Sequence, residues 1–275
     1  MNPYLDICSK VAEFNYLFGV IDYNYPNDKY FDEEKFDSNS NKFNESQVKL
    51  RFSLINEEIK ELEQAVKDKN PIEIVDAICD ILYVVAGAKI YFNLPIDEFV
   101  ANEIKNLNDK HKFTRDLSLQ KEDFNHIVEI LENEKVVNLI NKIKDNNSSL
   151  ENLTELLINK NKIKYHKKFL NHLIRIYDEI LDKIVKNIFK LANSQNFMID
   201  ITHQFNIVHS SNMTKVCICE EDAKETIEWY KINETRYKEP SYRKINFNEK
   251  DYYVVYDAET KKILKSIKYT PAKFI

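Results

Sequence analysis

Two helical segments that carry acids at helical spacing, residues 54–66 and 71–88, constrain this chain more than any other feature. They meet at Asn70-Pro71, which predicts a turn because the residue before a proline avoids the helical region. From Pro71 to Ala88 the chain contains no lysine or arginine, and most residues are apolar. A helix that is apolar on nearly every side belongs in a core. The stretch therefore predicts two antiparallel helices, the second of them buried.

The acids of the second segment share one helical face. At about 100° per residue they span an arc of roughly 60°; they are Glu73, Asp76 and Asp80. An unpaired carboxylate in apolar surroundings is unfavourable unless a cation compensates it, and this segment offers none. Oxygen ligands that converge from two helices suit Mg²⁺ or Mn²⁺, so the pattern predicts a divalent cation between the helices.

The acids of the first segment lie at i, i+1 and i+4; they are Glu57, Glu58 and Glu61. Taken alone, this trio fits a solvated helix face better than a metal site, because Lys60 and other polar residues lie beside it. Its proximity to the second trio across a short turn favours a shared metal site.

Composition excludes several classes of protein. Gly19 and Gly87 are the two glycines of the chain, whereas a P-loop or a dinucleotide-binding fingerprint needs glycines where the backbone approaches phosphate. Abundant leucine, isoleucine, lysine and glutamate with little glycine or proline favour a mostly α-helical protein. The net charge of −5 argues against a nucleic-acid partner.

The cysteines and the hydropathy pattern indicate a soluble protein of a reducing compartment. Cys8, Cys79, Cys217 and Cys219 show no spacing typical of a disulfide framework or a zinc site. The chain has no signal-peptide pattern and no apolar run long enough to span a bilayer. We therefore expect buried thiols, no membrane partner and a cytoplasmic location.

Hydrophobic periodicity predicts helices over most of the chain. The expected helices cover residues 4–20, 45–66, 71–92, 96–108, 124–143, 150–191 and 220–233, with a further helix after residue 196. Residues 22–46 are expected to form a loop, and Asn146 to Ser149 to separate two helices. The pattern near the C-terminus predicts a β-hairpin of residues 252–256 with 263–269.

Residues 109–195 differ from their surroundings and look like an insertion. They are rich in lysine, asparagine and isoleucine, and their histidines, including His126, His166 and His172, lack a shared acidic partner. The chain after Asn196 also echoes the pattern found after Asn93, which suggests that an ancestral chain ran straight from the helix of residues 71–92 into the helix after Asn196, before the residues between them were inserted or partly duplicated. We therefore predict one domain of residues 1–108 and 196–275, interrupted by a helical insertion at 109–195.

The acidic segments resemble a known family. INEEIKELEQA followed by EIVDAICDILYVVAGA is similar to the E-E-x-x-E … E-x-x-D signature of the all-α nucleotide pyrophosphohydrolases, which include MazG-type enzymes, dimeric dUTPases and phosphoribosyl-ATP pyrophosphohydrolase. VHSSNMTK at 208–215 and KSIKYTP at 265–271 resemble segments of the phage- and virus-type MazG-like branch. Two departures are Ser210, where that branch has arginine, and a tail without Gly-Pro. The resemblance covers residues 4–108 and 196–275.

The resemblance implies roles for particular residues. The Mg²⁺ ligands would be Glu58, Glu61, Asp76 and Glu73 or Asp80. Glu57 would be an outer ligand or would orient the attacking water, so Glu57 and Glu58 are the expected catalytic residues. The expected substrate contacts are Asn212 and Lys215, with Arg51 and Lys49 as weaker candidates and Asn15, Phe14 and Phe18 near the base. His209 is a further candidate, for which a capping or packing role is equally compatible with the sequence.

The implied fold is a MazG-like antiparallel helix bundle with a long helical insertion and a small C-terminal β-hairpin. The implied reaction is Mg²⁺-dependent hydrolysis of a nucleoside triphosphate to the monophosphate and pyrophosphate by a homodimer or homotetramer. A narrower dUTPase-like or phosphoribosyl-ATP activity is one alternative. The other is a non-catalytic helical interaction protein.

Overall fold

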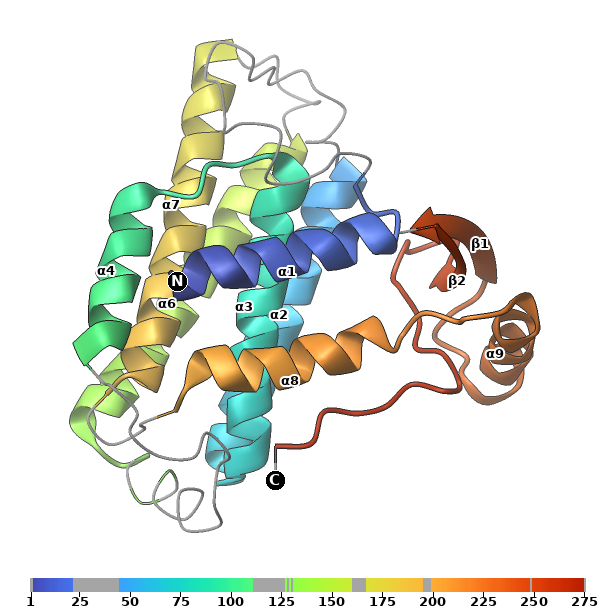
Figure 1. Ribbon diagram of the computed structural model, residues 1–275. Helices are drawn as coiled ribbons and strands as arrows, with labels where there is room; N and C mark the ends of the chain where they lie inside the picture. The colour runs from blue at the N-terminus through green and yellow to red at the C-terminus, as the bar shows by residue number, and fades with distance from the viewer. Residues whose placement is uncertain are drawn as a thin grey trace.

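The protein is mostly helical, as expected (Figure 1). The computed structural model describes residues 2–21, 45–110, 127, 129, 131–159, 167–194, 199–247 and 249–274. Its helices are α1 (Pro3–Leu17), α2 (Glu45–Lys67), α3 (Pro71–Phe92), α4 (Glu98–Lys110), α6 (Glu134–Ile158), α7 (Lys167–Ala192), α8 (Ile201–Met213) and α9 (Glu220–Asn233). The strands β1 (Pro240–Phe247) and β2 (Lys250–Asp257) form one antiparallel pair. This architecture confirms the predicted all-α class with a C-terminal hairpin.

Helix α3 lies at the centre of the molecule. The Asn70 side chain caps it by accepting the N–H of Glu73, and proline occupies its first position, where a missing N–H costs nothing. Asn93 ends it in the left-handed conformation, with φ of 56°, which asparagine tolerates better than most residues. These local signals explain why the predicted bounds of the helix agree with the structure.

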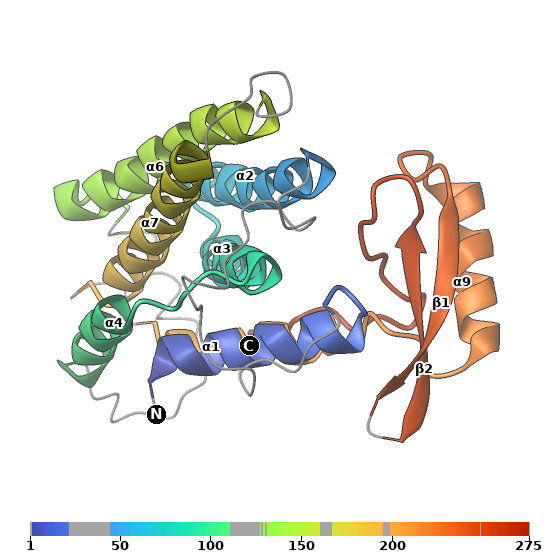
Figure 2. The same ribbon diagram turned by 90° about the horizontal axis from the view of Figure 1, so that it is seen from above.

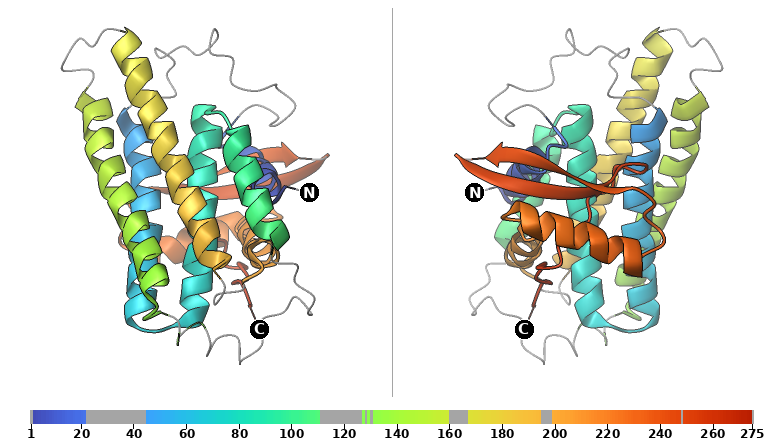
Figure 3. Two further views of the ribbon diagram at one scale, coloured as in Figure 1. Left: turned by 90° about the vertical axis from the view of Figure 1, so that its left-hand side faces the viewer. Right: turned by 90° about the vertical axis from the view of Figure 1, so that its right-hand side faces the viewer.

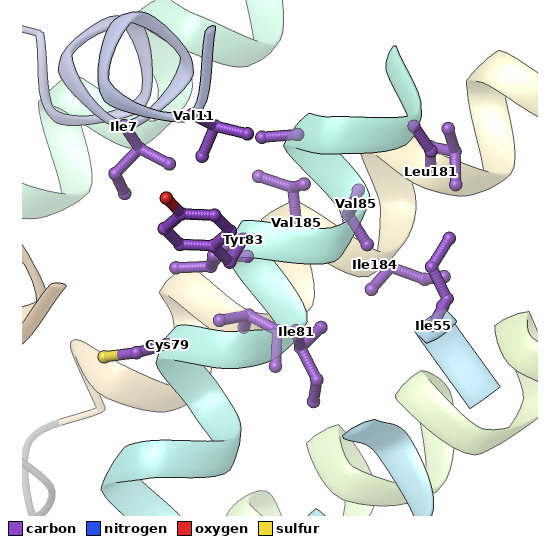
Figure 4. Close-up of a cluster of buried hydrophobic side chains, with 14 of the residues drawn as sticks. Ile7, Val11, Ile55, Cys79, Ile81, Tyr83, Val85, Leu181, Ile184 and Val185 are labelled. Atoms are coloured by element: carbon purple, nitrogen blue, oxygen red, sulfur yellow. The ribbon is translucent and has the colours of Figure 1, made fainter. Parts of the chain in front are cut away.

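Other helices pack around α3 on several sides. It contacts α1, α2, α7 and α8, while α1 also packs on α4 and α8 (Figure 2). Figure 4 shows Tyr83 directed towards Ile7 and Val11 of α1, and Val85 directed towards α7. Because its apolar residues are distributed around the whole helix, α3 is covered on nearly every side. The prediction of a buried second acidic helix is therefore confirmed.

The predicted helix break at Asn146 to Ser149 is wrong. Helix α6 continues through these residues to Ile158. The hydroxyl of Ser149 donates to the carbonyl of Asp145 at 2.9 Å, so its hydrogen-bond donor has a partner within the same helix. Asn147 donates to the side chain of Asn56 on α2 at 2.9 Å. Internal hydrogen bonds and contact with α2 therefore keep the helix intact through a sequence that elsewhere favours a cap.

Helices α6 and α7 complete the core of the bundle. Helix α7 packs on α3, α4 and α6, and α6 packs on α2 (Figure 3). Tyr177 and Phe189 of α7 are fully buried. Lys89 of α3 is also fully buried and lies 2.8 Å from Asp178 and 2.5 Å from Asp182 of α7. The origin of residues 109–195 as an insertion stays a prediction, but their helices share the core of the other segments.

The C-terminal hairpin forms with a different partner strand from the one predicted. Strand β2 covers the expected residues 252–256, but it pairs with β1, with Tyr242 opposite Val255. The expected second strand, 263–269, contributes a single bridge between Ile263 and Tyr256. Lys261, in the turn between β2 and Ile263, has a φ of 63°, and Cys217 bridges β2 at Tyr253, so no regular return strand forms there. The hairpin and α9 surround a small cluster of their own: Cys217, Ala223, Tyr230, Val255 and Leu264.

Other predictions can be placed briefly. The structure has helices at both ends of the proposed repeat, where Asp97 and Asp200 accept hydrogen bonds from the first turns of α4 and α8. Cys8, Cys79 and Cys217 are buried free thiols, and Cys219 is a half-buried one. Most of the loop expected at 22–46 lies outside the described residues, as do His126 and His166. Among the helices described here, none combines the length and apolarity that crossing a membrane would need.

Candidate active site

A cavity of about 410 Å³ lies between the helix bundle and the hairpin. Helices α1, α2, α3 and α8 and the segments around β1 and β2 all contribute to its walls. Because α2 and α3 are antiparallel, Glu58 lies at the same end of the cavity as Asp80, whereas Arg51 lies towards Tyr91. We call the end with Glu58 and Asp80 the carboxylate end, and the end with Arg51 and Tyr91 the aromatic end.

Glu58 and Asp80 are the predicted metal ligands that line the cavity itself. Burial, followed by the charge of Asp80, raises the pKa of Glu58 from 4.5 to about 8. Burial, followed by the charge of Asp76, raises the pKa of Asp80 from 3.8 to about 7. Both carboxyl groups are therefore held in surroundings that disfavour their ionised forms.

The remaining predicted acids do not line the cavity but lie at or beyond its carboxylate end, on α2 and α3. Burial and the charges of Glu73 and Glu61 raise the pKa of Asp76 to about 6, and burial with the charges of Glu57 and Glu73 raises the pKa of Glu61. Both trios therefore form one interacting set, although Glu57, Glu61 and Glu73 are exposed. Within the described ranges, no three acidic, histidine or cysteine side chains form a group that could hold a metal ion as they stand.

A lysine from the far end of the chain lies among these acids. Lys215, just after α8, lines the cavity, and its charge favours the ionised forms of Glu58 and Asp80. Burial lowers the pKa of Lys215, and the charge of Asp80 opposes this effect. Asn212, one turn earlier on α8, also lines the cavity. The two residues predicted from the SNMTK segment thus meet the acids of α2 and α3 although more than a hundred positions separate them in sequence.

His209 lies behind the cavity wall. Its Nδ1 is 3.2 Å from the hydroxyl of Tyr83, and Tyr83 lines the cavity whereas His209 does not. Burial lowers the pKa of His209 to about 4, so its imidazole is neutral at neutral pH. In this position the histidine holds the tyrosine ring, as the packing alternative for this residue suggested.

The aromatic end contains polar groups in an apolar wall. The Arg51 guanidinium lies 4.4 Å from the centre of the Tyr91 ring, a cation–π arrangement. Asn15 is 4% exposed and its Nδ2 has no hydrogen-bond partner within the described structure. Gly87 lies beside Asn15, and a Cβ at Gly87 would come within 3.8 Å of that amide nitrogen. The absence of a side chain at Gly87 therefore leaves space in front of the asparagine.

Two further candidates do not line the cavity. Lys49 is exposed and pairs with Glu45 at 2.5 Å within α2. Phe18 is buried and stacks on Phe14 at 4.0 Å between ring centres, so it supports the cavity wall from behind.

Sequence reasoning missed the cavity wall that the C-terminal segment supplies. Arg243, Tyr256, Lys261 and Lys262 all line the cavity. The Nζ of Lys262 lies 3.1 Å from a carboxylate oxygen of Glu57. A cluster of lysines at 261, 262 and 265 was visible in the sequence, but nothing local indicated that it would lie over acids two hundred residues away.

The fold and the site together define an all-α protein with an acidic cavity between antiparallel helices. The model of the phosphoribosyl-ATP pyrophosphohydrolase family matches residues 28–108, the part of the chain that contains both acidic trios. An uncharacterized protein, L479, of Acanthamoeba polyphaga mimivirus is 34% identical over 257 residues, which cover 93% of this chain and 89% of the relative. No solved structure matches the chain.

The chain belongs to the MazG-like superfamily of all-α nucleotide pyrophosphohydrolases, in its phosphoribosyl-ATP pyrophosphohydrolase-like branch. Membership supports a pyrophosphohydrolase activity on nucleotides.

Proposed function

We propose that the protein hydrolyses nucleoside triphosphates between the α- and β-phosphates, with Mg²⁺, to give the monophosphate and pyrophosphate. The observation that carries this proposal is the position of Glu58 and Asp80. Their carboxyl groups line the same cavity from facing helices, and both have strongly raised pKa values. Perturbed carboxylates in a cavity are typical of catalytic and ligand-binding sites.

The dimensions of the cavity suit a nucleotide. Its volume of about 410 Å³ falls in the range of roughly 300–1,000 Å³ that is typical of small-molecule sites. Along α2 its lining extends from Gln47 to Glu58, which at 1.5 Å per residue is roughly 16 Å. That length accommodates a base at the aromatic end and phosphates at the carboxylate end. Asn15 and Arg51 would then lie near the base and sugar.

The side chains at the carboxylate end fit a hard divalent cation. The carboxylates there offer oxygen donors, the type that Mg²⁺ prefers, and burial followed by repulsion from neighbouring acids raises the pKa values of Asp76 and Asp80. The residues that would hold the ion are Glu58, Glu61, Asp76 and Asp80, with Glu73 at the edge of the set. When bound, such an ion neutralises phosphate charge and lowers the pKa of a coordinated water. Mn²⁺ could replace Mg²⁺ because it accepts the same oxygen ligands.

The protein's own residues have separate parts in this scheme. Glu57, at the exposed edge of the set, would orient water or accept its proton. Lys215 and Asn212 would bind the phosphates, because both line the cavity beside Asp80. Tyr83 forms the wall between α1 and α3, held from behind by His209.

A narrower substrate is the second candidate. The matched family model is that of phosphoribosyl-ATP pyrophosphohydrolase, which favours testing that compound beside the common nucleotides and dUTP. A non-catalytic helical protein is the remaining alternative, and it predicts neither turnover nor stabilisation by Mg²⁺.

The test is a panel of ribo- and deoxyribonucleoside triphosphates with phosphoribosyl-ATP, incubated with and without Mg²⁺ and separated by chromatography. We expect the monophosphate and pyrophosphate in equal amounts, only with the metal. Asp80→Asn should abolish turnover, whereas Asp145→Asn, at an exposed position of α6, should retain it. Release of inorganic phosphate with a diphosphate product would refute the proposed bond cleavage, and no turnover of any compound would favour the non-catalytic alternative.

A further inference from the structure

The segment that follows β2, residues 261–266, brings lysines to the carboxylate end of the cavity. Lys261 and Lys262 line the cavity together with Glu58 and Asp80. The Nζ of Lys262 lies 3.1 and 3.3 Å from the two carboxylate oxygens of Glu57. The segment lies outside residues 28–108, which the family model matches.

The backbone of this segment is fixed at several points. The N–H of Leu264 donates to the carbonyl of Val255 at 2.9 Å, and that of Ser266 donates to the carbonyl of Lys215 at 3.2 Å. The N–H of Lys265 donates to the Tyr230 hydroxyl at 3.0 Å. The Ser266 bond connects the segment directly to the backbone of Lys215. The lysines are therefore carried by an anchored stretch of chain.

The side chains of the segment alternate between the interior and the solvent. Leu264 and Ser266 are 2% and 4% exposed, whereas Lys265 between them is exposed. The Lys265 ammonium lies 4.6 Å from the centre of the Tyr269 ring. Its charge also favours the ionised forms of Asp76 and Glu61, so this ammonium faces the outer part of the acidic set.

The direction of the substrate follows from the two ends of the cavity, and here the inference rests on the proposed function. With the base at the aromatic end and the α-phosphate at Glu58 and Asp80, the β- and γ-phosphates extend further in the same direction. The next acids in that direction are Glu61 and Asp76, one turn further along α2 and α3. Lys262 lines the cavity at this end and lies 3.1 Å from Glu57, and Lys265 follows on the same anchored segment, so both lysines lie towards the outer phosphates.

We propose that Lys262 and Lys265 bind the β- and γ-phosphates of the substrate and hold the pyrophosphate that leaves. In the structure Lys262 is paired with Glu57, with side chains that are 34% and 45% exposed. Such partly exposed pairs are weak, so the ammonium can exchange the carboxylate for a phosphate at little cost. The exchange would also release Glu57 towards the reacting water. The C-terminal segment thus discriminates a triphosphate from a monophosphate.

The test compares Lys262→Ala, Lys265→Ala and the double variant with Lys273→Ala, an exposed lysine of the same tail. Binding of inorganic pyrophosphate with Mg²⁺ is measured by calorimetry, and product inhibition by pyrophosphate and by the monophosphate is measured kinetically. A charge-assisted hydrogen bond corresponds to roughly tenfold in affinity. We expect about tenfold weaker pyrophosphate binding for each single variant, and a larger loss for the double variant. Monophosphate inhibition should change less than about twofold.

Further variants and controls distinguish a failure of this inference from a failure of the proposed function and from misfolding. Lys262→Arg and Lys265→Arg keep the charge and should restore most of the pyrophosphate affinity, and unchanged melting temperatures would exclude misfolding. An active wild-type enzyme whose double variant binds pyrophosphate normally would overturn this inference and leave the proposed function intact. A wild-type protein that binds pyrophosphate but cleaves no nucleotide would refute the proposed function and still support the lysine site. A wild-type protein that does neither would overturn both.

Discussion

Replacing Asp80 with asparagine should stabilise the metal-free protein at alkaline pH. Its pKa of about 7, against an ordinary value of 3.8, means that the folded state disfavours its ionised form. Each pKa unit corresponds to about 1.4 kcal/mol, so this cost is at most about 4 kcal/mol at pH 8. Lys215 loses a favourable partner in the variant, which offsets part of the gain. We therefore expect a net stabilisation of about 1–3 kcal/mol.

The sign of this effect depends on pH. Because the folded state keeps the Asp80 proton to a higher pH than the unfolded chain does, wild-type stability falls as the pH rises from about 4 to about 7. At pH 5 the carboxyl group is still protonated in the folded protein but already ionised in the unfolded chain, so less than half of the advantage of asparagine is present. At pH 8 the whole advantage is present.

The assay is thermal and chemical denaturation in the presence of a chelator at pH 5 and pH 8. At roughly 2–4 °C per kcal/mol for a chain of this size, the melting temperature should rise by about 2–12 °C at pH 8 and by less than half as much at pH 5. Asp145→Asn is the control. A destabilised Asp80→Asn protein at pH 8, or an equal gain at both pH values, would refute the claim that the carboxylate is held in unfavourable surroundings.

Three further substitutions test the fold and the cavity. Lys89→Met should destabilise the protein by about 3–5 kcal/mol, because it leaves two largely buried carboxylates without their cation. Adding Asp178→Asn and Asp182→Asn should restore part of the free energy of unfolding measured by denaturation. Gly87→Ala should raise helix stability by up to about 1 kcal/mol. It should also raise KM for the nucleotide, because the Cβ of the new alanine enters the cavity, and an unchanged KM would argue against a base at the aromatic end. Gly19→Ala should lower the melting temperature, since φ is +59° and the new Cβ would lie 2.8 Å from a side-chain carbon of β1.

The helices that sequence reasoning predicted best have local signals at their ends. Asn70-Pro71 and Asn93 bound α3 because a capping side chain, a proline and a left-handed residue act where they stand in the sequence. The acidic trios were recognisable for the same reason, since helical spacing alone determines which side chains share a face.

The errors arose where tertiary contacts decide the outcome. Asn147 forms part of a helix because Asn56 of α2 accepts its amide hydrogen, a partner that the local sequence does not reveal. Residues 263–269 have the composition of a strand, but their pairing with β2 stops after Ile263 and Leu264, because Cys217 exchanges two backbone hydrogen bonds with β2 at Tyr253. The contact between Lys262 and Glu57 joins positions 205 residues apart, and no periodicity or motif encodes such a distance. The cavity wall from the C-terminal segment therefore required the structure.

The central claim is that these carboxylates tolerate their buried surroundings because a divalent cation binds there together with a polyphosphate. The most direct measurement is Mn²⁺ binding, followed by electron paramagnetic resonance, with an α,β-non-hydrolysable nucleoside triphosphate present. Wild-type protein and Asp145→Asn should bind the ion with the same affinity, and Asp80→Asn should lose at least about tenfold. Equal Mn²⁺ affinity in the wild-type and Asp80→Asn proteins would contradict the account.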